Sequence, residues 1–559
     1  MNMTWDEAVS TLTGSGCPFE ITTQEVMGLP TKVYSRTPNS LRDLFMIARL
    51  YGDKPYLVYE DETWSYTDLV QHIDGLAHAL VHSYGIEKGD RVAIAMRNYP
   101  EWIVAFAAIT SIGGIAVALN AWWVTDELEY GLKDSGSKLV IVDEERVKRI
   151  APILEAAKAA AIAIRATGEL PPGIDRYEDV IQLGAEMPEI GIDTDDDATI
   201  LYTSGTTGFP KGAVSTHRAV LSALVGFACR AEIGKLTGSG GEVGAGEDDP
   251  AVILCVPLFH VTGLVPVMMG TFVSGSRLVM MHRWDPDRAL ELIERERITT
   301  FVGVPTMSWE LLESPDFARR DTSSLSSVSG GGAPAPPELV RRIEDGFDTA
   351  RPGIGYGMTE TNALGPQNSG NDYVAKPTSA GRVSPSMDIS VIDEKGNVLG
   401  PNERGEICFR GANLIRCYWG KPDETAEVIS DGWLKSGDIG WLDDDGFIFV
   451  ADRAKDMVLR AGENIYSAEV EAAIYEHPGV YEAAVYGVPH ERLGEEVATT
   501  VMVKAGRSID AKELQDFLSE RIAKFKVPTH MKFVTEQLPR NASGKILKRE
   551  LREVMIKES

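Results

Sequence analysis

The feature that most constrains this chain is the run from Thr203 to Gly212, which contains hydroxyls, glycines and one lysine, Lys211. It follows a β-prone apolar stretch, Ala198 to Tyr202. Glycines let backbone N–H groups turn inward and approach an anion without a Cβ in the way. A plain glycine-rich turn is the alternative, but turns seldom carry so many hydroxyl donors before Pro-Lys-Gly. The run therefore predicts a loop that holds nucleotide phosphates.

This loop differs from the common phosphate loop G-x-x-x-x-G-K-[ST]. Gly212 follows Lys211 at the position where that motif has a magnesium-binding hydroxyl. The residues from Gly212 to Ser215 favour a second short strand, so we do not expect a helix N-terminus to supply the anion site.

Size and charge limit the class of protein. At 559 residues the chain exceeds what one hydrophobic core supports, so we expect two or more domains. The formal net charge of -28 argues against a nucleic-acid partner, because such proteins present a basic face. Five cysteines without metal-ligand spacing favour reduced thiols in the cytoplasm. The first residues, Met1 to Glu7, have neither a basic region nor an apolar run, so we expect no secretory signal.

One long uncharged stretch raises the question of a membrane span. Ala251 to Ser276 has no formally charged residue apart from His260 when it is protonated. Its prolines and glycines favour a buried strand and a helix beside a pocket. We therefore expect no integral membrane span, and we leave peripheral membrane contact open.

Apolar β-rich runs alternate with helical segments along most of the chain, which predicts an α/β fold with layered sheets and helices. Examples are a strand at Arg91 to Met96 and a helix at Pro286 to Glu296. After Val450 the pattern changes to a small α+β unit of about one hundred residues. We predict a large N-terminal domain over 1–452 and a small C-terminal domain over 453–559.

Six further strings carry a resemblance to a known family. They are Pro257–His260 (PLFH), Ser329–Pro334 (SGGGAP), Tyr356–Glu360 (YGMTE), Ser436–Asp438 (SGD), Asp452–Asp456 (DRAKD) and Asn541–Lys545 (NASGK). With the hydroxyl-glycine run, they resemble the adenylate-forming superfamily of acyl-CoA synthetases, 4-coumarate–CoA ligases, peptide-synthetase adenylation domains and firefly luciferases. The order and approximate spacing are those of the family, and the resemblance covers nearly the whole chain.

The resemblance implies an ATP-dependent activation of a carboxylic acid. The carboxylate attacks the α-phosphorus of ATP, giving a mixed anhydride and pyrophosphate, and charge must be neutralised throughout. By resemblance, Glu360 would hold Mg²⁺ and Thr359 would hydrogen-bond the α-phosphate. A solvated surface acid is the alternative for Glu360. CoA is the implied second substrate.

The resemblance also assigns the nucleotide contacts. Tyr356 would lie against adenine, Asp438 would accept hydrogen bonds from the ribose hydroxyls, and Arg453 would hold ribose and phosphate, unless it forms a structural ion pair. Ser436 stands where the family usually has threonine. The residues assigned to ATP and CoA binding are Thr203, Ser204, Gly205, Thr206, Thr207, Gly208, Lys211, Gly332, Ala333, Pro334, Tyr356, Gly357, Met358, Asp438, Arg453 and Gly462.

Lys545 is the residue most directly tied to catalysis by the resemblance. It would enter the site during adenylation and contact the carboxylate and the α-phosphate. A solvated basic face is the alternative, because the C-terminal tail is rich in lysine and arginine. The family runs two half-reactions by rotating its small domain, and the alignment puts the hinge at Lys455.

The acid is less well defined by the sequence. His260 stands where amino-acid-activating domains typically have aspartate, and it is catalytic by resemblance, lying near the substrate carboxylate. A structural core histidine is the alternative. The segments expected to wall the acyl pocket, Val261 to Leu264, Val302 to Pro305 and Ser329 to Gly331, are apolar or small. We therefore predict an AMP-forming acid–CoA ligase for a fatty or other largely apolar acid, aromatic and steroid-derived acids included.

Three other functions stay open. The first is transfer of the acyl group to a carrier-protein thiol, by a stand-alone enzyme, since the chain ends shortly after Lys545 with no carrier domain attached. The second is luciferase-like oxidation of an acyl-adenylate. The third is a non-catalytic lipid-binding protein, although Glu360, Asp438, Arg453 and Lys545 together argue against it. A homodimer is also left open.

Overall fold

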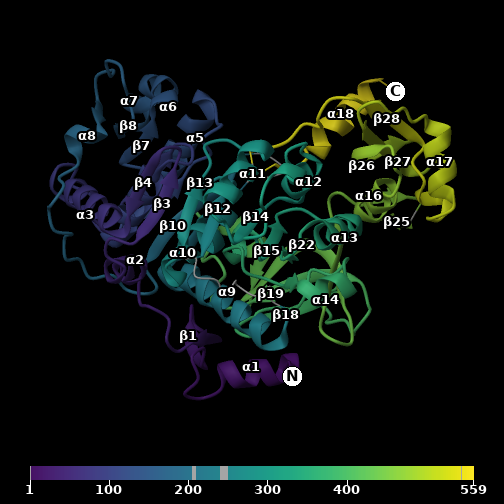
Figure 1. Ribbon diagram of the computed structural model, residues 1–559, viewed down its shortest axis with the longest axis horizontal. Helices are drawn as coiled ribbons and strands as arrows, with labels where there is room; N and C mark the ends of the chain where they lie inside the picture. Colours follow the sequence, from purple (N-terminus) through teal and green to yellow (C-terminus); the bar gives the residue numbers. More distant parts are fainter. Residues whose placement is uncertain (1, 204–208, 240–249, 462, 543, 559) are drawn as a thin grey trace.

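The chain folds into a large α/β body and a smaller C-terminal unit, as the computed structural model in Figure 1 shows. The structure describes residues 2–203, 209–239, 250–461, 463–542 and 544–558. Within those residues, two eight-stranded sheets form most of the body. The predicted α/β class with a small α+β unit at the C-terminus is confirmed.

The first of these sheets contains the strands on either side of the hydroxyl-glycine run. Its interior strands are parallel, whereas β11 and β20 add antiparallel to one edge. Parallel strands are buried on both faces and read as continuous apolar runs. The order across the sheet is β20 (Cys417–Tyr418), β11 (Lys211–Thr216), β10 (Asp197–Thr203), β6 (Ile115–Ala118), β5 (Arg91–Ala95), β7 (Leu139–Asp143), β8 (Ala160–Ile164) and β9 (Ile174–Arg176).

The second sheet is parallel at its centre and has an antiparallel strand at each edge. It carries three of the strings that resemble the adenylate-forming family at the ends of its strands. The order is β17 (Gln367–Ser369), β16 (Arg351–Gly355), β15 (Ser327–Gly331), β14 (Thr300–Gly303), β12 (Ala251–Leu254), β13 (Arg277–Met280), β3 (Pro55–Tyr59) and β4 (Glu62–Ser65).

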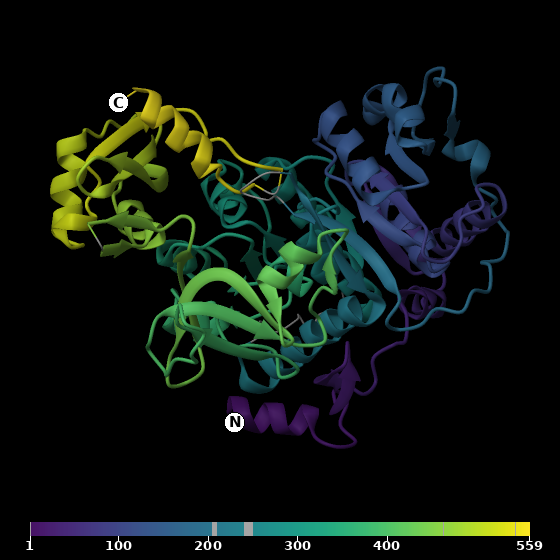
Figure 2. The ribbon, with the colours of Figure 1, turned by 180° about the vertical axis from the view of Figure 1, so that it is seen from behind.

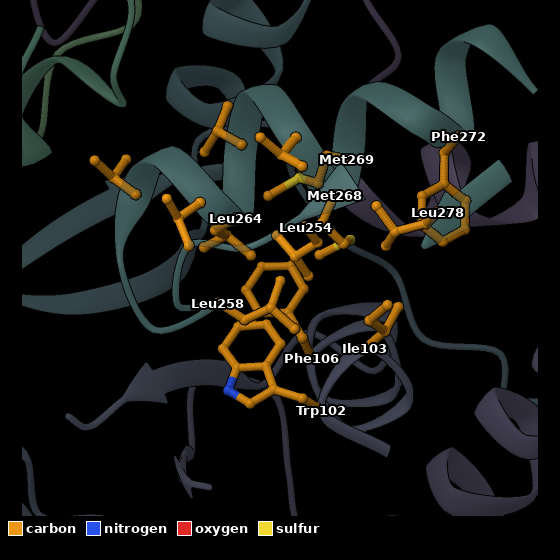
Figure 3. Close-up of a cluster of buried hydrophobic side chains, with 14 of the residues drawn as sticks. Trp102, Ile103, Phe106, Leu254, Leu258, Leu264, Met268, Met269, Phe272 and Leu278 are labelled. Atoms are coloured by element: carbon orange, nitrogen blue, oxygen red, sulfur yellow. The ribbon is translucent and has the colours of Figure 1, made fainter. Parts of the chain in front are cut away.

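The hydrophobic core of the body is centred on helix α4 (Pro100–Ser111), every residue of which is buried. Its N-terminus is favoured by Pro100, whose missing N–H costs nothing in the first turn. Figure 3 shows Trp102 and Phe106 of α4 pointing toward Leu264 and Met268. The two α4 rings stack with centroids 5.5 Å apart. A helix that is apolar on all sides is expected where it is enclosed by other elements.

The uncharged stretch from Ala251 to Ser276 forms strand β12, a π-helical segment, η3 (Gly263–Met269), and helix α10 (Gly270–Ser274). Pro266 has no N–H to donate inside the helix, which favours the wider register of η3. Among the described residues, each helix is too short or too polar to cross a bilayer.

A further antiparallel sheet connects the body to the C-terminal unit. It comprises β18 (Asp388–Ile392), β19 (Gly405–Arg410), β22 (Trp433–Leu442), β21 (Ile429–Ser430) and β23 (Ile448–Arg453). The predicted domain boundary, 452/453, falls in the last two residues of β23. That boundary stays a prediction.

The C-terminal unit lies to one side of the body, coloured olive to yellow in Figure 2. It has a hydrophobic cluster of its own, which includes Val470, Val485 and Leu514. Its strands are β25 (Glu463–Ile465), β24 (Val458–Arg460), β27 (Gly494–Val503), β26 (Val480–His490) and β28 (His530–Val534), and its helices are α16 (Ser467–Tyr475), α17 (Ala511–Ser519) and α18 (Lys548–Glu558).

Candidate active site

Several of the predicted site residues lie at the carboxyl edge of the second sheet. Parallel strands β12, β14, β15 and β16 all end at this edge. The residues that follow them are His260, Pro305, the segment 332–334 and the segment 356–358. Ligands of open α/β sheets bind at such an edge, because loops from neighbouring strands converge there.

Two glycines explain how the loops after β15 and β16 fold. A Cβ on Gly357 would lie 2.2 Å from the carbonyl oxygen of Ala363, so a side chain cannot fit. Gly332 has φ of +76°, a conformation that residues with a side chain rarely adopt. The backbone of both loops is therefore open to a close approach by a ligand.

Tyr356, Asp438 and Arg453 form one contacting group. The Tyr356 hydroxyl donates to Asp438 Oδ2 at 2.6 Å, and Arg453 Nε lies 3.6 Å from Asp438 Oδ1. Asp438 and Arg453 are directly paired across β22 and β23. Burial raises the pKa of the Asp438 carboxyl, and the nearby Arg453 opposes that rise. The aromatic ring, the carboxylate and the guanidinium thus lie together, as the ribose and adenine roles require.

Lys545 lies near this group, on a turn between Arg540 and Ile546, which form an isolated bridge. The backbone N–H of Lys545 donates to Asn541 Oδ1 at 2.9 Å. A Cβ on Gly544 would lie 3.0 Å from a methyl of Val304, so the turn touches the carboxyl edge of β14. Burial lowers the pKa of the Lys545 ammonium to about 8, and the charge of Arg453 lowers it as well. The solvated-face alternative for Lys545 does not fit this half-buried position.

A second group of residues lies at the start of β11. The Lys211 ammonium is 5.0 Å from the centre of the Tyr418 ring, within the range of a cation–π contact. The Tyr418 hydroxyl donates to Glu360 Oε1 at 2.6 Å. Thr203, at the end of β10, donates weakly to the carbonyl oxygen of Lys211 at 3.4 Å. Lys211 and Glu360, which are far apart in the sequence, are thus joined through Tyr418.

Glu360 fits the requirements of a magnesium ligand. Glu360 lies in the short helix η5 (Thr359–Thr361) and is only 8% exposed. The carboxylate is therefore not a solvated surface acid. The described residues contain no cluster of three histidine, cysteine or acidic side chains that could hold a metal alone. Mg²⁺ bound at a nucleotide usually takes only one or two protein carboxylates, with phosphates and water completing the shell.

His260 precedes the helix that contains η3. Its Nδ1 accepts the N–H of Thr262 at 3.4 Å, so the proton of the neutral ring lies on Nε2. Burial lowers the pKa of the His260 imidazole to about 4, which keeps the ring neutral near pH 7. The ring is half-buried. It can therefore donate a hydrogen bond to a carboxylate without a full charge.

The structure brings most of the predicted set into these neighbouring groups. Six predicted residues, Ser204, Gly205, Thr206, Thr207, Gly208 and Gly462, lie outside the described residues, so their roles stay predictions. Sequence reasoning missed Tyr418, which contacts Glu360 and Lys211. No motif contains it, and its partners lie at distant positions in the chain, so the sequence alone gave no signal for it.

A cavity of about 450 Å³ separates the C-terminal unit from helices α12 (Pro305–Glu313) and α13 (Pro337–Gly346). Trp309 and Arg342 line it from the body, whereas Tyr475 and Glu482 line it from the C-terminal unit. The two parts are therefore not packed into one continuous core at this place.

Comparisons with known proteins agree with this geometry. The family model "AMP-binding enzyme" matches residues 44–419, and "AMP-binding enzyme C-terminal domain" matches residues 469–545. The chain is 36% identical over 491 residues to a feruloyl-CoA synthase of Amycolatopsis sp, covering 87% of this chain and 93% of that protein. It is 32% identical to a long-chain-fatty-acid–CoA ligase of Bacillus subtilis, covering 90% of this chain and 92% of that one.

Among solved structures, o-succinylbenzoate CoA synthetase of Bacillus subtilis, in complex with its acyl-adenylate intermediate, superposes with a TM-score of 0.77. It is 31% identical, and the match covers 92% of this chain and 98% of that one. Both family regions and the relatives cover most of the chain. The chain therefore belongs to the AMP-binding enzyme family, as an AMP-forming acid–CoA ligase of the adenylate-forming superfamily.

Proposed function

We propose that this enzyme uses ATP to convert a largely apolar carboxylic acid to its acyl-adenylate and then transfers the acyl group to the thiol of CoA. The observation that carries the proposal is the contact of Tyr356, Asp438 and Arg453, with Lys545 beside them. These residues offer a ring, a diol acceptor and two cations at one place. The acyl-adenylate in a solved relative of the same fold supports it.

In the first half-reaction, a carboxylate oxygen of the acid attacks the α-phosphorus of ATP. The bond to the bridging oxygen of the β-phosphate breaks, and pyrophosphate leaves with that electron pair. We assign the Lys545 ammonium to the carboxylate and the α-phosphate, and the Thr359 hydroxyl to an α-phosphate oxygen. His260 would donate from Nε2 to the incoming carboxylate. These donors would stabilise charge that is largest in the transition state.

The phosphate end of the site would be held by Lys211 and by the loop that precedes it. We assign Glu360 to Mg²⁺, which would neutralise charge on the phosphates of ATP when bound. Tyr418 would orient the Glu360 carboxylate, because its hydroxyl occupies one of the two oxygens.

In the second half-reaction, the CoA thiol attacks the acyl carbon, and AMP leaves as the acyl–oxygen bond breaks. We propose that the C-terminal unit, residues 453–559, rotates about Lys455 between the two steps. Lys455 is exposed in a turn between β23 and β24. The cavity beside α12 and α13 supports this, because rotation need not break a continuous core there.

The proposed apolar substrate rests on the residues near His260. The segments 261–264, 302–305 and 329–331 contribute no charged side chain. A pocket without a charge disfavours a second ionised group on the acid, because an unpaired buried charge is costly. Two relatives support this proposal by their names, one for an aromatic acid (feruloyl) and one for long-chain fatty acids.

The test is AMP release from ATP by the purified protein, with fatty, aryl and steroid acids, each with and without CoA. AMP release that needs CoA and one class of acid would support the proposal and identify the substrate. Acid-dependent pyrophosphate exchange with no AMP release on adding CoA would favour transfer to a carrier-protein thiol instead. Inactivity with every acid would leave the lipid-binding alternative.

The rate of acyl-adenylate formation should fall as the pH rises above about 8. Lys545 must carry a proton to neutralise the phosphate, and its pKa is lowered to about 8. Below that pH the ammonium is present, and above it the rate should fall about tenfold per pH unit. The measurement is ATP–pyrophosphate exchange between pH 6 and 10.

The matched control is Lys545→Arg, since arginine keeps its charge through this range. The variant should be slower throughout but should show no decline near pH 8. An unchanged decline in Lys545→Arg would assign the titration to another group.

Replacement of Tyr418 by phenylalanine should weaken magnesium activation. The variant keeps the ring beside Lys211 and removes the hydroxyl that donates to Glu360. Loss of such an orienting bond typically costs about tenfold or more in metal affinity. We expect the Mg²⁺ concentration for half-maximal exchange to rise about tenfold at saturating acid. An unchanged value would mean that Glu360 does not bind the metal or does not need Tyr418.

A further inference from the structure

A buried polar network connects Arg453 and Lys545, the two cationic residues near Asp438. Asp452, which directly precedes Arg453, accepts the backbone N–H of Ser467 at the start of α16. Lys548, three residues after Lys545, donates to the Ser467 hydroxyl at 2.6 Å. Arg453 and Lys545 are thus linked through Asp452 and Lys548, residues that lie close to them in the chain. Neither Asp452 nor Lys548 is among the residues assigned to substrate.

The network is closed by Glu471, one turn into α16. Lys548 Nζ lies 2.7 Å from Glu471 Oε1, and the same carboxylate oxygen accepts the N–H of Val485 at 2.8 Å. Asp452 is 7% exposed and Ser467 is fully buried. Buried charges that are paired and hydrogen-bonded hold a fixed geometry, because separating them would leave a buried charge without a partner, which is costly in free energy.

The other end of the Lys545 turn is held in a similar way. Arg540 forms an ion pair with Glu482 of β26 and also donates to the carbonyl oxygen of Gly544 at 2.6 Å. Glu482 is 2% exposed. The turn that carries Lys545 is therefore held at both ends by ion pairs within the C-terminal unit, Arg540 with Glu482 and Lys548 with Glu471. The bond from Ser467 to Asp452 links this unit to β23, before the proposed hinge.

We infer that Asp452 and Lys548 are positioning residues that set Lys545 and Arg453 against the nucleotide during acyl-adenylate formation. The inference rests on the proposed function and goes beyond it, because neither side chain touches substrate. The proposed rotation about Lys455 would separate Asp452 from Ser467, which lie on opposite sides of the hinge, and would leave the pair of Lys548 and Glu471 intact. The network thus stabilises the adenylate-forming arrangement alone.

The test measures the two half-reactions separately in Asp452→Ala and Lys548→Met. We expect ATP–pyrophosphate exchange to fall about tenfold in each, mainly in kcat, because small displacements of catalytic groups are costly. Formation of acyl-CoA from supplied acyl-adenylate and CoA should stay within about twofold, because the Asp452 bond is absent from that arrangement.

A second readout does not need turnover. Lys545 reacts with acetic anhydride through its free amine, so the pH dependence of its labelling, followed by peptide mass spectrometry, gives its pKa. That pKa is about 8 in the parent structure, and the charge of Lys548 contributes to lowering it. The labelling is therefore compared in Asp452→Ala, which keeps Lys548, and we expect the pKa of Lys545 to rise there as the turn loosens. The labelling still tests the inference if the parent enzyme activates no acid, which would count against the proposed function only.

Three controls separate positioning from general damage. Lys557→Met changes an exposed lysine of the same helix, α18, and should alter neither readout. Lys548→Arg keeps a cation and should recover part of the exchange rate. Lys548→Met combined with Glu471→Gln removes the stranded carboxylate and should recover thermal stability without recovering exchange. Equal losses in both half-reactions, or an unchanged labelling pKa, would overturn the inference.

Discussion

Replacement of Lys545 by alanine should lower the rate of acyl-adenylate formation by about 10²–10³ fold, the usual cost of losing one charge contact made in the transition state. The side chain is half-buried beside Asp438 and Arg453, so water cannot fully replace its ammonium. The effect should be mainly on kcat in ATP–pyrophosphate exchange. The KM for ATP should change little, because Arg453 and Lys211 remain.

The control is Lys524→Ala, which removes an exposed lysine of the same unit and should leave exchange unchanged. Lys545→Ala should also keep its ability to form acyl-CoA from supplied acyl-adenylate, because that step does not use Lys545. Exchange at the parental rate in Lys545→Ala would refute the assignment. A loss of both half-reactions with a lower melting temperature would indicate a structural role instead.

The strands and helices of this protein were largely predictable, because they depend on local patterns. The apolar run Arg91 to Met96 forms β5, Arg91–Ala95, and the amphipathic segment Pro286 to Glu296 forms α11, Pro286–Arg295. The order of strands within the sheets was not predictable. In the first sheet, β20 of residues 417–418 pairs with β11 of residues 211–216. Such distant pairs leave no periodic signal in the sequence.

The site residues divide in the same way, into those that a local string predicts and those that only the fold brings together. Glycine-rich strings marked loops where backbone must approach a ligand, and Gly357 shows why: a side chain there would meet Ala363. Contacts that depend on a single residue from a distant element were missed. Tyr418 lies 58 residues from Glu360 in the chain, and Lys548 lies 81 residues from Ser467. Only the fold brings such partners together.

The Asp452 network also bears on how the two half-reactions are separated. An enzyme that uses Lys545 for adenylation and then withdraws it needs a contact that holds the first arrangement and is lost on rotation. Ser467 and Asp452 make such a contact across the proposed boundary. The connection from β23 to β24 must absorb the change in backbone angles.

Replacement of Lys455 by proline should lower acyl-CoA formation from supplied acyl-adenylate by about 10² fold or more, because rotation would be blocked. Proline fixes φ near about −65°. In the described residues the Lys455 N–H makes no hydrogen bond, so none is lost in the adenylate-forming arrangement. The ring restricts Ala454, so ATP–pyrophosphate exchange should fall, by less than about fivefold.

Lys455→Ala is the matched control, since it removes the same side chain and keeps φ free; both half-reactions should stay near the parental rates. The pattern in Lys455→Pro is the reverse of that expected for Lys545→Ala, in which exchange is lost and thioester formation is kept. Mixing the two variants should not restore acyl-CoA formation beyond what released acyl-adenylate supplies. Parallel loss of both half-reactions in Lys455→Pro would mean that Lys455 is part of a rigid junction, and that one arrangement of the C-terminal unit serves both steps.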